Sequence, residues 1–324
     1  MQALARLPVL QRERDRAAGL NTAGYVSGYR GSPLGGLDMA LQEAQPILQA
    51  HDISFRPAVN EELAATALWG TQQLHLLPGP RRDGMFGMWY GKGPGVDRCG
   101  DVFKHANYAG TSRHGGVLAV AGDDHSARSS AVAHQSEHVF SACAMPVLAP
   151  AGVQDILDLG LHGWALSRWC GCWVAMKLSS ETAETSATVA LDAHRVAVAL
   201  PGDFALPADG VHLRWPDPPL AQERRMQEFK IYAAAAYARA NGLNQLVFDT
   251  PRPRLGIIAC GKAWLDVRQA LAGLGIDGRV AADIGLRLYR VGMPWPLEAA
   301  GVRRFARGLR EILVVEEKRQ VIEY

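Results

Sequence analysis

The sequence predicts an α/β protein built from two units: a doubly wound, mostly parallel sheet followed by a smaller α/β domain. Two observations support this fold class. Short apolar segments alternate with helix-like stretches through residues 1–200, and this order is typical of a parallel sheet with helices on both faces. After a stretch rich in Pro, Asp and Gly, a second and shorter alternation begins. The chain has 324 residues, which is long enough for two domains.

The predicted strands of the first unit are short apolar runs separated by Gly, Pro or polar residues. They are Ala23–Ser27, Ile53–Val59, Gly84–Tyr90, Gly116–Ala121, Met145–Ala149 and Trp173–Leu178. The helices predicted between them are Leu37–Ala50, Glu61–Leu76, a segment around Phe103–Tyr108, Ser129–Ala142 and Val153–Ser167. Because ligands of such sheets bind at the carboxyl ends of the strands, the loops that follow the strands are the candidate site.

The remainder of the chain divides into a connector and the second unit. We expect residues 1–200 to form the first domain, residues 201–252 a connector with one helix at Gln222–Asn241, and residues 253–324 the smaller domain. The smaller domain has strands predicted at Leu255–Gly261, Arg287–Val291 and Glu311–Glu317, with helices at Ala263–Leu274 and Leu297–Gly308. The chain stops soon after the last strand, so we expect this domain to be truncated and the chain to be part of a longer protein.

Composition and charge exclude several functional classes. The chain is 48% hydrophobic and 20% charged with a net charge of +2, which is ordinary for a soluble globular protein. It has no basic tract that would suggest nucleic acid, no apolar run of the roughly 20 residues that span a bilayer, and no signal peptide. Five scattered cysteines make no disulfide framework, and Cys170 and Cys172 are too few for an iron–sulfur cluster. We therefore expect a cytoplasmic protein.

Three loops after successive strands are rich in Gly and polar residues, which favours one shared ligand site. They are Gly28–Asp38, Gly91–Arg98 and Gly122–Ser130. Glycine lets the backbone approach a ligand closely. The run Gly91-Lys92-Gly93-Pro94-Gly95 does not match the dinucleotide pattern Gly-x-Gly-x-x-Gly, and we expect Pro94 to prevent a helix from starting there.

Glu61 is the strongest candidate for a functional side chain. Asn60 is a good helix cap, and Glu61 and Glu62 suit the positive end of the helix that follows. A carboxylate at this strand-to-helix junction, with small residues behind it, can face a ligand at the sheet edge. The local pattern alone is more often that of a plain capped helix with solvated acids.

The glycine-rich loops resemble those of a known family. The segments Asn21–Gly36, Trp89–Arg98 and Gly122–His125 are similar to the N-terminal region of the long bacterial indolepyruvate ferredoxin oxidoreductases, which are thiamine-diphosphate-dependent 2-oxoacid oxidoreductases. The resemblance runs from Leu7 to the last residue. It implies that the first unit is of the type that binds the aminopyrimidine ring of thiamine diphosphate. It also implies that the second unit is of the transketolase C-terminal type.

The resemblance also implies roles for individual residues. In the family, a Glu nine positions before a helix Gly activates the cofactor, and this spacing selects Glu61 with Gly70, with Glu62 as the weaker neighbour. The loop residues that would contact the cofactor are Tyr90, Gly91, Lys92, Gly93 and Pro94. The residues that would contact the substrate are Ser32, Arg30 and His125. Ser32 is also explained as a turn hydroxyl before Pro33, and His125 as a loop residue bonded to the backbone.

The chemistry of thiamine explains the need for a carboxyl group. The cofactor acts through a carbanion at its C2 atom, and a Glu bonded to the ring nitrogen N1′ favours the imino form of the aminopyrimidine that removes the C2 proton. The resemblance then implies oxidative decarboxylation of a 2-oxoacid, such as the arylpyruvate indolepyruvate, to an acyl-CoA. Coenzyme A and ferredoxin would be partners, together with the remaining domains of the same enzyme, in a homodimer.

Several features of the family are absent from this chain. No Gly-Asp-Gly motif followed by Asn is present for the diphosphate and Mg2+, and no ferredoxin-like cysteine run is present. We expect Mg2+ and [4Fe-4S] clusters to be bound by parts of the enzyme outside this chain. Gly122-Asp123-Asp124 stands where pyruvate-specific relatives have a substrate-binding Arg, so the identity of the 2-oxoacid is open.

Two other functions compete with this one. His134-Gln135-Ser136-Glu137-His138 matches the His-x-x-Glu-His pattern of a zinc-peptidase family, and on a helix His134 and His138 would share one face. The second alternative is a non-catalytic interaction domain in which the Glu61 carboxylate is unused.

Overall fold

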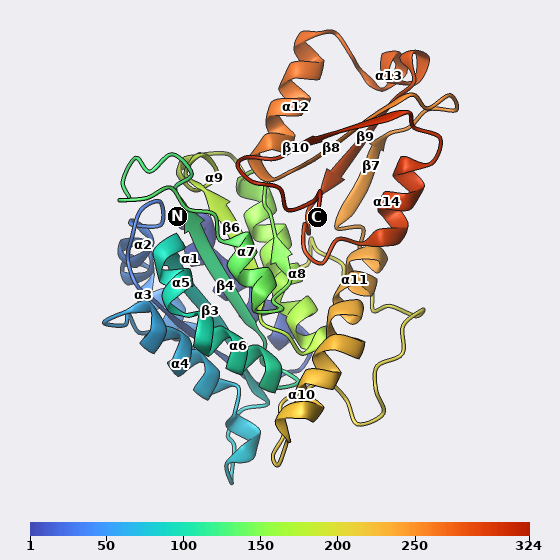
Figure 1. The fold of residues 1–324 in the computed structure, drawn as a ribbon. Coiled ribbons are helices and arrows are strands. Elements are labelled where there is room, and N and C mark those ends of the chain that lie inside the picture. Colours follow the sequence, from blue (N-terminus) through green and yellow to red (C-terminus); the bar gives the residue numbers. More distant parts are fainter.

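A computed structural model describes all 324 residues and shows two sheets (Figure 1). The first sheet has six parallel strands in the order β2-β1-β3-β4-β6-β5. The strands are β1 (Thr22–Gly28), β2 (Ile53–Phe55), β3 (Gly84–Lys92), β4 (Val117–Asp123), β5 (Val147–Leu148) and β6 (Val174–Ser179). The predicted doubly wound parallel sheet is thus confirmed.

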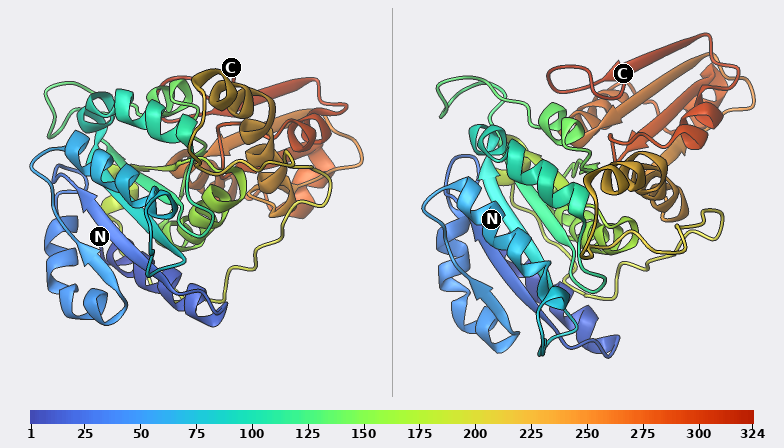
Figure 2. Two further views of the ribbon diagram at one scale, coloured as in Figure 1. Left: turned by 90° about the horizontal axis from the view of Figure 1, so that it is seen from below. Right: turned by 60° about the horizontal axis from the view of Figure 1, so that its bottom comes forward.

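Helices cover both faces of the first sheet (Figure 2). One face carries α1 (Gln2–Ala17), α2 (Leu37–Glu43), α3 (Gln45–Ala50) and α8 (Val153–Cys170). The other face carries α4 (Glu61–Thr71), α5 (Gly93–Arg98), α6 (Gly100–Ala109) and α7 (Glu137–Ala142); a short 3-10 turn, η1 (Leu74–Leu76), follows α4. Successive strand residues point to opposite faces, so that Tyr90 belongs to the first core and Trp89 to the second.

The second sheet has the order β10-β8-β9-β7, and β7 is antiparallel to β9. Its strands are β7 (Asn244–Phe248), β8 (Leu255–Cys260), β9 (Leu286–Val291) and β10 (Glu311–Val315). The helices α12 (Gly261–Gly273), α13 (Gly278–Ile284) and α14 (Ala299–Ala306) pack on it through two small apolar clusters. The sheet begins at β7, nine residues before the predicted boundary at 253.

A connector without strands joins the two sheets. After α9 (Ser180–Glu184), residues 185–218 contain no helix or strand. A nearly continuous helical segment follows: α10 (Pro219–Arg225), one π-helical turn η2 (Met226–Lys230) and α11 (Ile231–Ala240). The apolar side of α11 packs against α8 through Ala233, Ala234 and Tyr237.

Two helices differ from the sequence-based expectation. Helix α1 was not predicted, because Arg12 and Asp15 interrupt its apolar pattern; both are buried and paired, Arg12 with Asp52 and Asp15 with Arg168. Helix α5 begins at Gly93, so the expectation that Pro94 prevents a helix start was wrong. Proline is tolerated in the first turn, where the backbone N–H has no intrahelical acceptor.

Candidate active site

The loops after β1, β3 and β4 meet at the carboxyl edge of the first sheet. Gly28 lies opposite Tyr90 in the β1–β3 register, and Lys92 lies opposite Gly122 in the β3–β4 register. The contacts are too close for larger side chains. A Cβ atom on Gly31 would lie 2.8 Å from Lys92 Cδ, and one on Gly122 would lie 2.7 Å from Leu34 Cγ. The structure therefore brings the three predicted loops together.

Glu61 is the first residue of α4 and is held at its backbone. The Asn60 side chain accepts a hydrogen bond of 2.8 Å from the Leu63 N–H, which caps the helix. Trp89 Nε1 on β3 donates to the Glu61 carbonyl oxygen at 3.0 Å. Glu61 is 8% exposed, whereas its neighbour Glu62 is exposed. Of the two first-turn carboxylates, only Glu61 lies against the sheet edge.

The Glu61 side chain rests in a cradle of two glycines from β3 and α5. A Cβ atom on Gly91 would lie 3.3 Å from Glu61 Cγ, and one on Gly95 would overlap Cγ and lie 2.7 Å from Oε1. Any larger residue at Gly95 would displace the carboxylate. Glycine is thus required at these two positions because the Glu61 side chain packs directly against the backbone there. This explains the glycines more specifically than a turn would.

The carboxylate of Glu61 differs from the other buried carboxylates in having no partner. Asp15 accepts from Arg168 and Thr22, and Asp123 accepts from the Ser136 amide and hydroxyl. Glu61 is 8% exposed, and its side-chain oxygens take part in no hydrogen bond or ion pair of the structure. Because buried carboxylates are normally paired, the Glu61 carboxylate is available to accept a hydrogen bond from an external donor.

The other predicted cofactor residues divide between two faces of the sheet. Gly91, Gly93 and Pro94 lie at the β3–α5 junction beside Glu61. The Tyr90 ring points to the opposite face and is buried near Asp38, and burial raises the pKa of its hydroxyl. Lys92 points toward the β1 loop, where it packs on Gly31. Any contact of Tyr90 with a ligand at Glu61 is therefore made by its backbone.

The three predicted substrate residues are not equally placed. Ser32 is half-buried and precedes Pro33, which packs on Gly122 at the end of β4. Arg30 is exposed and has no partner. His125 is half-buried after β4, with Nδ1 3.5 Å from Glu317 and Nε2 3.9 Å from Asp123. The roles of these residues remain predictions.

Beside His125 lies a cluster of buried charges that sequence reasoning missed. Lys177, near the carboxyl end of β6, is 6% exposed, and its Nζ lies 3.1 Å from Glu137 and 2.8 Å from Glu317. Burial by itself lowers the pKa of a lysine, but Glu137, Glu317 and Asp123 outweigh it and raise the pKa of Lys177. Glu317 follows β10, and it also accepts from the Lys262 amide at the start of α12 at 2.6 Å. Lys177 thus joins the two sheets.

The proposed zinc motif is not assembled. His134 lies before α7, which begins only at Glu137, so His134 and His138 do not share a helix face. Two of its members have other partners: Glu137 pairs with Lys177, and His134 Nε2 lies 2.8 Å from Asp97 on α5. The structure holds no group of three side chains placed to bind a metal. The segment 129–136 is irregular because Ser136 bonds Asp123 instead of continuing the helix.

Comparison with known proteins agrees with the fold and with the loops. Residues 244–324 match the family model described as the indolepyruvate ferredoxin oxidoreductase middle domain. Over 314 residues the chain is 26% identical to indolepyruvate oxidoreductase subunit IorA of Methanothermobacter marburgensis, a match that covers 95% of this chain and 46% of the relative. The chain is related to the indolepyruvate ferredoxin oxidoreductases. The IorA subunit of Pyrococcus abyssi is 25% identical over 241 residues, which cover 71% of this chain and 34% of that subunit.

Solved structures support the same fold. A 2-oxoglutarate:ferredoxin oxidoreductase from Magnetococcus marinus aligns over 98% of this chain and 57% of its own, with a TM-score of 0.65 and 13% identity. Transketolase from Leishmania mexicana aligns over 98% of this chain and 38% of its own, with a TM-score of 0.53 and 13% identity. The expected transketolase C-terminal-like second unit is thus confirmed. The chain spans about half the length of the two Methanothermobacter IorA subunits that it matches. None of its helices has the length and apolar character needed to cross a bilayer.

Proposed function

We propose that this chain forms the pyrimidine-binding side of the thiamine diphosphate site in a 2-oxoacid:ferredoxin oxidoreductase. The observation that carries the proposal is the Glu61 carboxylate, which is buried in a glycine cradle and has no partner in the chain. A ring nitrogen that shares a proton with Glu61 would satisfy it. The relationship to IorA subunits and the loops that converge beside Glu61 support the same assignment.

Each residue near Glu61 has a defined task in this proposal. Bound thiamine diphosphate supplies a carbon nucleophile for the keto carbon of a 2-oxoacid. Glu61 holds a proton at the ring nitrogen N1′, and Trp89 fixes the backbone from which Glu61 projects. Gly91 and Gly95 leave room for the carboxylate, and the α5 start closes the site on one side. The backbone from Tyr90 to Pro94 lines the ring, and Ser32, Arg30 and His125 face the substrate.

The wider reaction is also part of the proposal. The substrate is a 2-oxoacid of the arylpyruvate kind, as the name of the IorA relatives suggests, and the product is an acyl-CoA. The Magnetococcus marinus structure is described with 2-oxoglutarate, coenzyme A and succinyl-CoA bound, which supports this reaction class. Mg2+, [4Fe-4S] clusters and the contact with ferredoxin belong to other parts of a cytoplasmic, homodimeric enzyme. The zinc hydrolase alternative is not favoured, because His134 pairs with Asp97 and Glu137 pairs with Lys177, and no group of three side chains is placed to bind a metal.

The proposal is tested with a matched pair of variants in the complete enzyme. Glu61→Gln preserves the size of the side chain but removes the carboxylate, and we expect it to reduce turnover about 10²-fold or more. Glu62→Gln removes the same charge from the same helix turn at an exposed position, and we expect near wild-type turnover. The assay is arylpyruvate-dependent reduction of an electron acceptor, with circular dichroism to verify folding. Full activity of folded Glu61→Gln would refute the proposal.

A further inference from the structure

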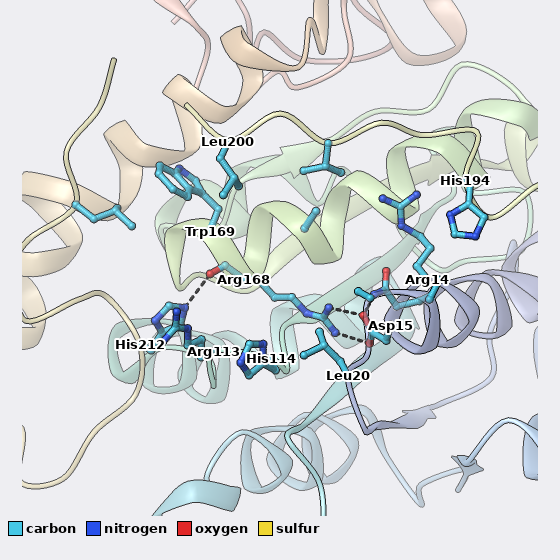
Figure 3. A pocket seen from close by; sticks show the side chains of 16 residues that line it. Arg14, Asp15, Leu20, Arg113, His114, Arg168, Trp169, His194, Leu200 and His212 are labelled. Atoms are coloured by element: carbon cyan, nitrogen blue, oxygen red, sulfur yellow. Dashed lines mark hydrogen bonds and ion pairs between the residues drawn. The ribbon is translucent and has the colours of Figure 1, made fainter. Parts of the chain in front are cut away.

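A cavity lies at the opposite end of the first sheet from Glu61, beside the Arg168–Asp15 pair (Figure 3). Its volume is about 810 Å3, within the range of small-molecule sites. Its walls are the end of α1, the residues before β4, the last turns of α8 and the connector between residues 194 and 212. The seven residues of β4, at about 3.3 Å each, separate it from the Glu61 edge by about 20 Å. It is therefore independent of the proposed cofactor site.

The charged side chains of this cavity are strongly unbalanced. Its lining includes three arginines and three histidines but only one carboxylate, that of Asp15. The six basic residues are Arg14, Arg113, Arg168, His114, His194 and His212. The carboxylate is already neutralised. Arg168 Nη1 and Nη2 donate to the two oxygens of Asp15 at 2.6 and 2.8 Å, and Gln11 and Thr22 donate to it as well. Asp15 therefore cannot balance another cation.

Two guanidinium groups are left without a counter-charge. Arg14 Nη1 donates to the carbonyl oxygens of Ala193 and Val196, both at 2.7 Å, and these acceptors are neutral. Arg113 is exposed and has no partner. The pKa of His114 is lowered, first by burial and then by the charges of Arg168 and Arg113, as expected in a region of positive potential.

The remaining wall is apolar. Trp169 and Leu200 lie close together in Figure 3, and Leu20 lies apart from them. Val198 and Leu206 of the connector also line the cavity. The Trp169 ring is fixed by a hydrogen bond of 3.1 Å from Nε1 to the Ala233 carbonyl. The cavity thus combines a rigid aromatic surface with uncompensated guanidinium groups.

We propose that this cavity binds a small organic anion, with an apolar body against Trp169 and Leu200 and a carboxylate or phosphate group at Arg113, which lies on the other side of Arg168 from Arg14 (Figure 3). Arginine pairs with both kinds of oxyanion through parallel N–H bonds. The connector forms one wall, and it is fastened to α1 and α8 by Arg14 and by the His212 contact of 2.8 Å with the Arg168 carbonyl. An anion bound there ties the connector more firmly to the first domain.

The test is isothermal titration calorimetry of the 324-residue chain with four probes. Phenyl phosphate and phenylacetate distinguish the two anionic groups, inorganic phosphate lacks the apolar body, and benzyl alcohol lacks the charge. We expect at least one aryl anion to bind with a Kd of about 1 mM or tighter, and more tightly than inorganic phosphate or benzyl alcohol. Binding should weaken with added salt and should protect the connector from limited proteolysis.

Arg113→Gln is the decisive variant, because Arg113 has no partner whose loss would disturb the fold. It should weaken binding of the aryl anion by about fivefold or more, whereas Arg279→Gln, an exposed change on α13, should have no effect. No binding by either aryl anion, equal binding of benzyl alcohol, or unchanged binding in Arg113→Gln would overturn the proposal. Loss of probe binding in the complete enzyme would do the same, since another part of the enzyme then covers the cavity.

Discussion

Replacing Lys177 by Met is predicted to be one of the most destabilising single changes in the molecule. Lys177 is the only cation between the buried carboxylates of Glu137 and Glu317, whose side chains are 7% and 12% exposed. Methionine matches the length of lysine but leaves both carboxylates without their counter-charge. Breaking a buried ion pair by removing one partner costs about 3–5 kcal/mol. At about 2 °C per kcal/mol for a chain of this size, the melting temperature should fall by about 6–10 °C.

The assay is thermal and urea denaturation of wild type and two comparison variants. Lys262→Met removes an exposed lysine that pairs with Asp266 one helical turn away, and we expect a cost of only about 0.3–0.5 kcal/mol. Glu317→Gln keeps the Lys177–Glu137 ion pair and keeps a side-chain oxygen that can accept from the Lys262 amide at the start of α12. It should therefore lower the free energy of unfolding by less than Lys177→Met does. A Lys177→Met variant within about 1 kcal/mol of wild type would refute the reasoning.

Three further predictions concern the surroundings of Glu61. Gly95→Ala should fold but lower turnover of the complete enzyme, because the new methyl group displaces Glu61; unchanged kinetics would show that the carboxylate is not held there. Gly93→Ala should lower the melting temperature, because its Cβ overlaps the His134 ring; Gly100→Ala on α6, with open space around it, is the control. Asp123 and Asp97 raise the pKa of His134 to about 9. The protonated His134 therefore contributes fully to the free energy of unfolding below about pH 6.5, and this contribution is lost as the pH rises through about 9. Denaturation curves of wild type should show this loss, and those of His134→Asn should not.

The fold class and the position of Glu61 were predictable from local sequence. The alternation of strands and helices follows from short-range apolar pattern, and a parallel sheet places the loops after its strands at one edge. Asn60 marks the start of α4 through its own side chain, and this cap is present. The choice of Glu61 over Glu62 depends on which residue faces β3, and the burial of Glu61 agrees with it.

The charged cluster around Lys177 was not predictable, because its pairs join residues far apart in the chain. Lys177 and Glu317 are separated by 140 positions and belong to different sheets. A lysine in an apolar strand resembles a solvated residue until its partners are known. Helix α1 was not predicted for the same reason, because its buried Arg12 is paired with Asp52, which lies 40 positions away in the chain. The His134–His138 pattern misled for the opposite reason, since its residues are near in sequence but point to different partners.

The most direct test of the central claim is hydrogen–deuterium exchange at C2 of thiamine diphosphate bound to the complete enzyme, followed by NMR. The account requires Glu61, acting at N1′, to promote loss of this proton before any substrate is present. Exchange in Glu61→Gln should be about 10²-fold slower or more than in wild type, with cofactor binding retained, and Glu62→Gln should match wild type. Equal exchange rates in Glu61→Gln and wild type would contradict the role assigned to Glu61.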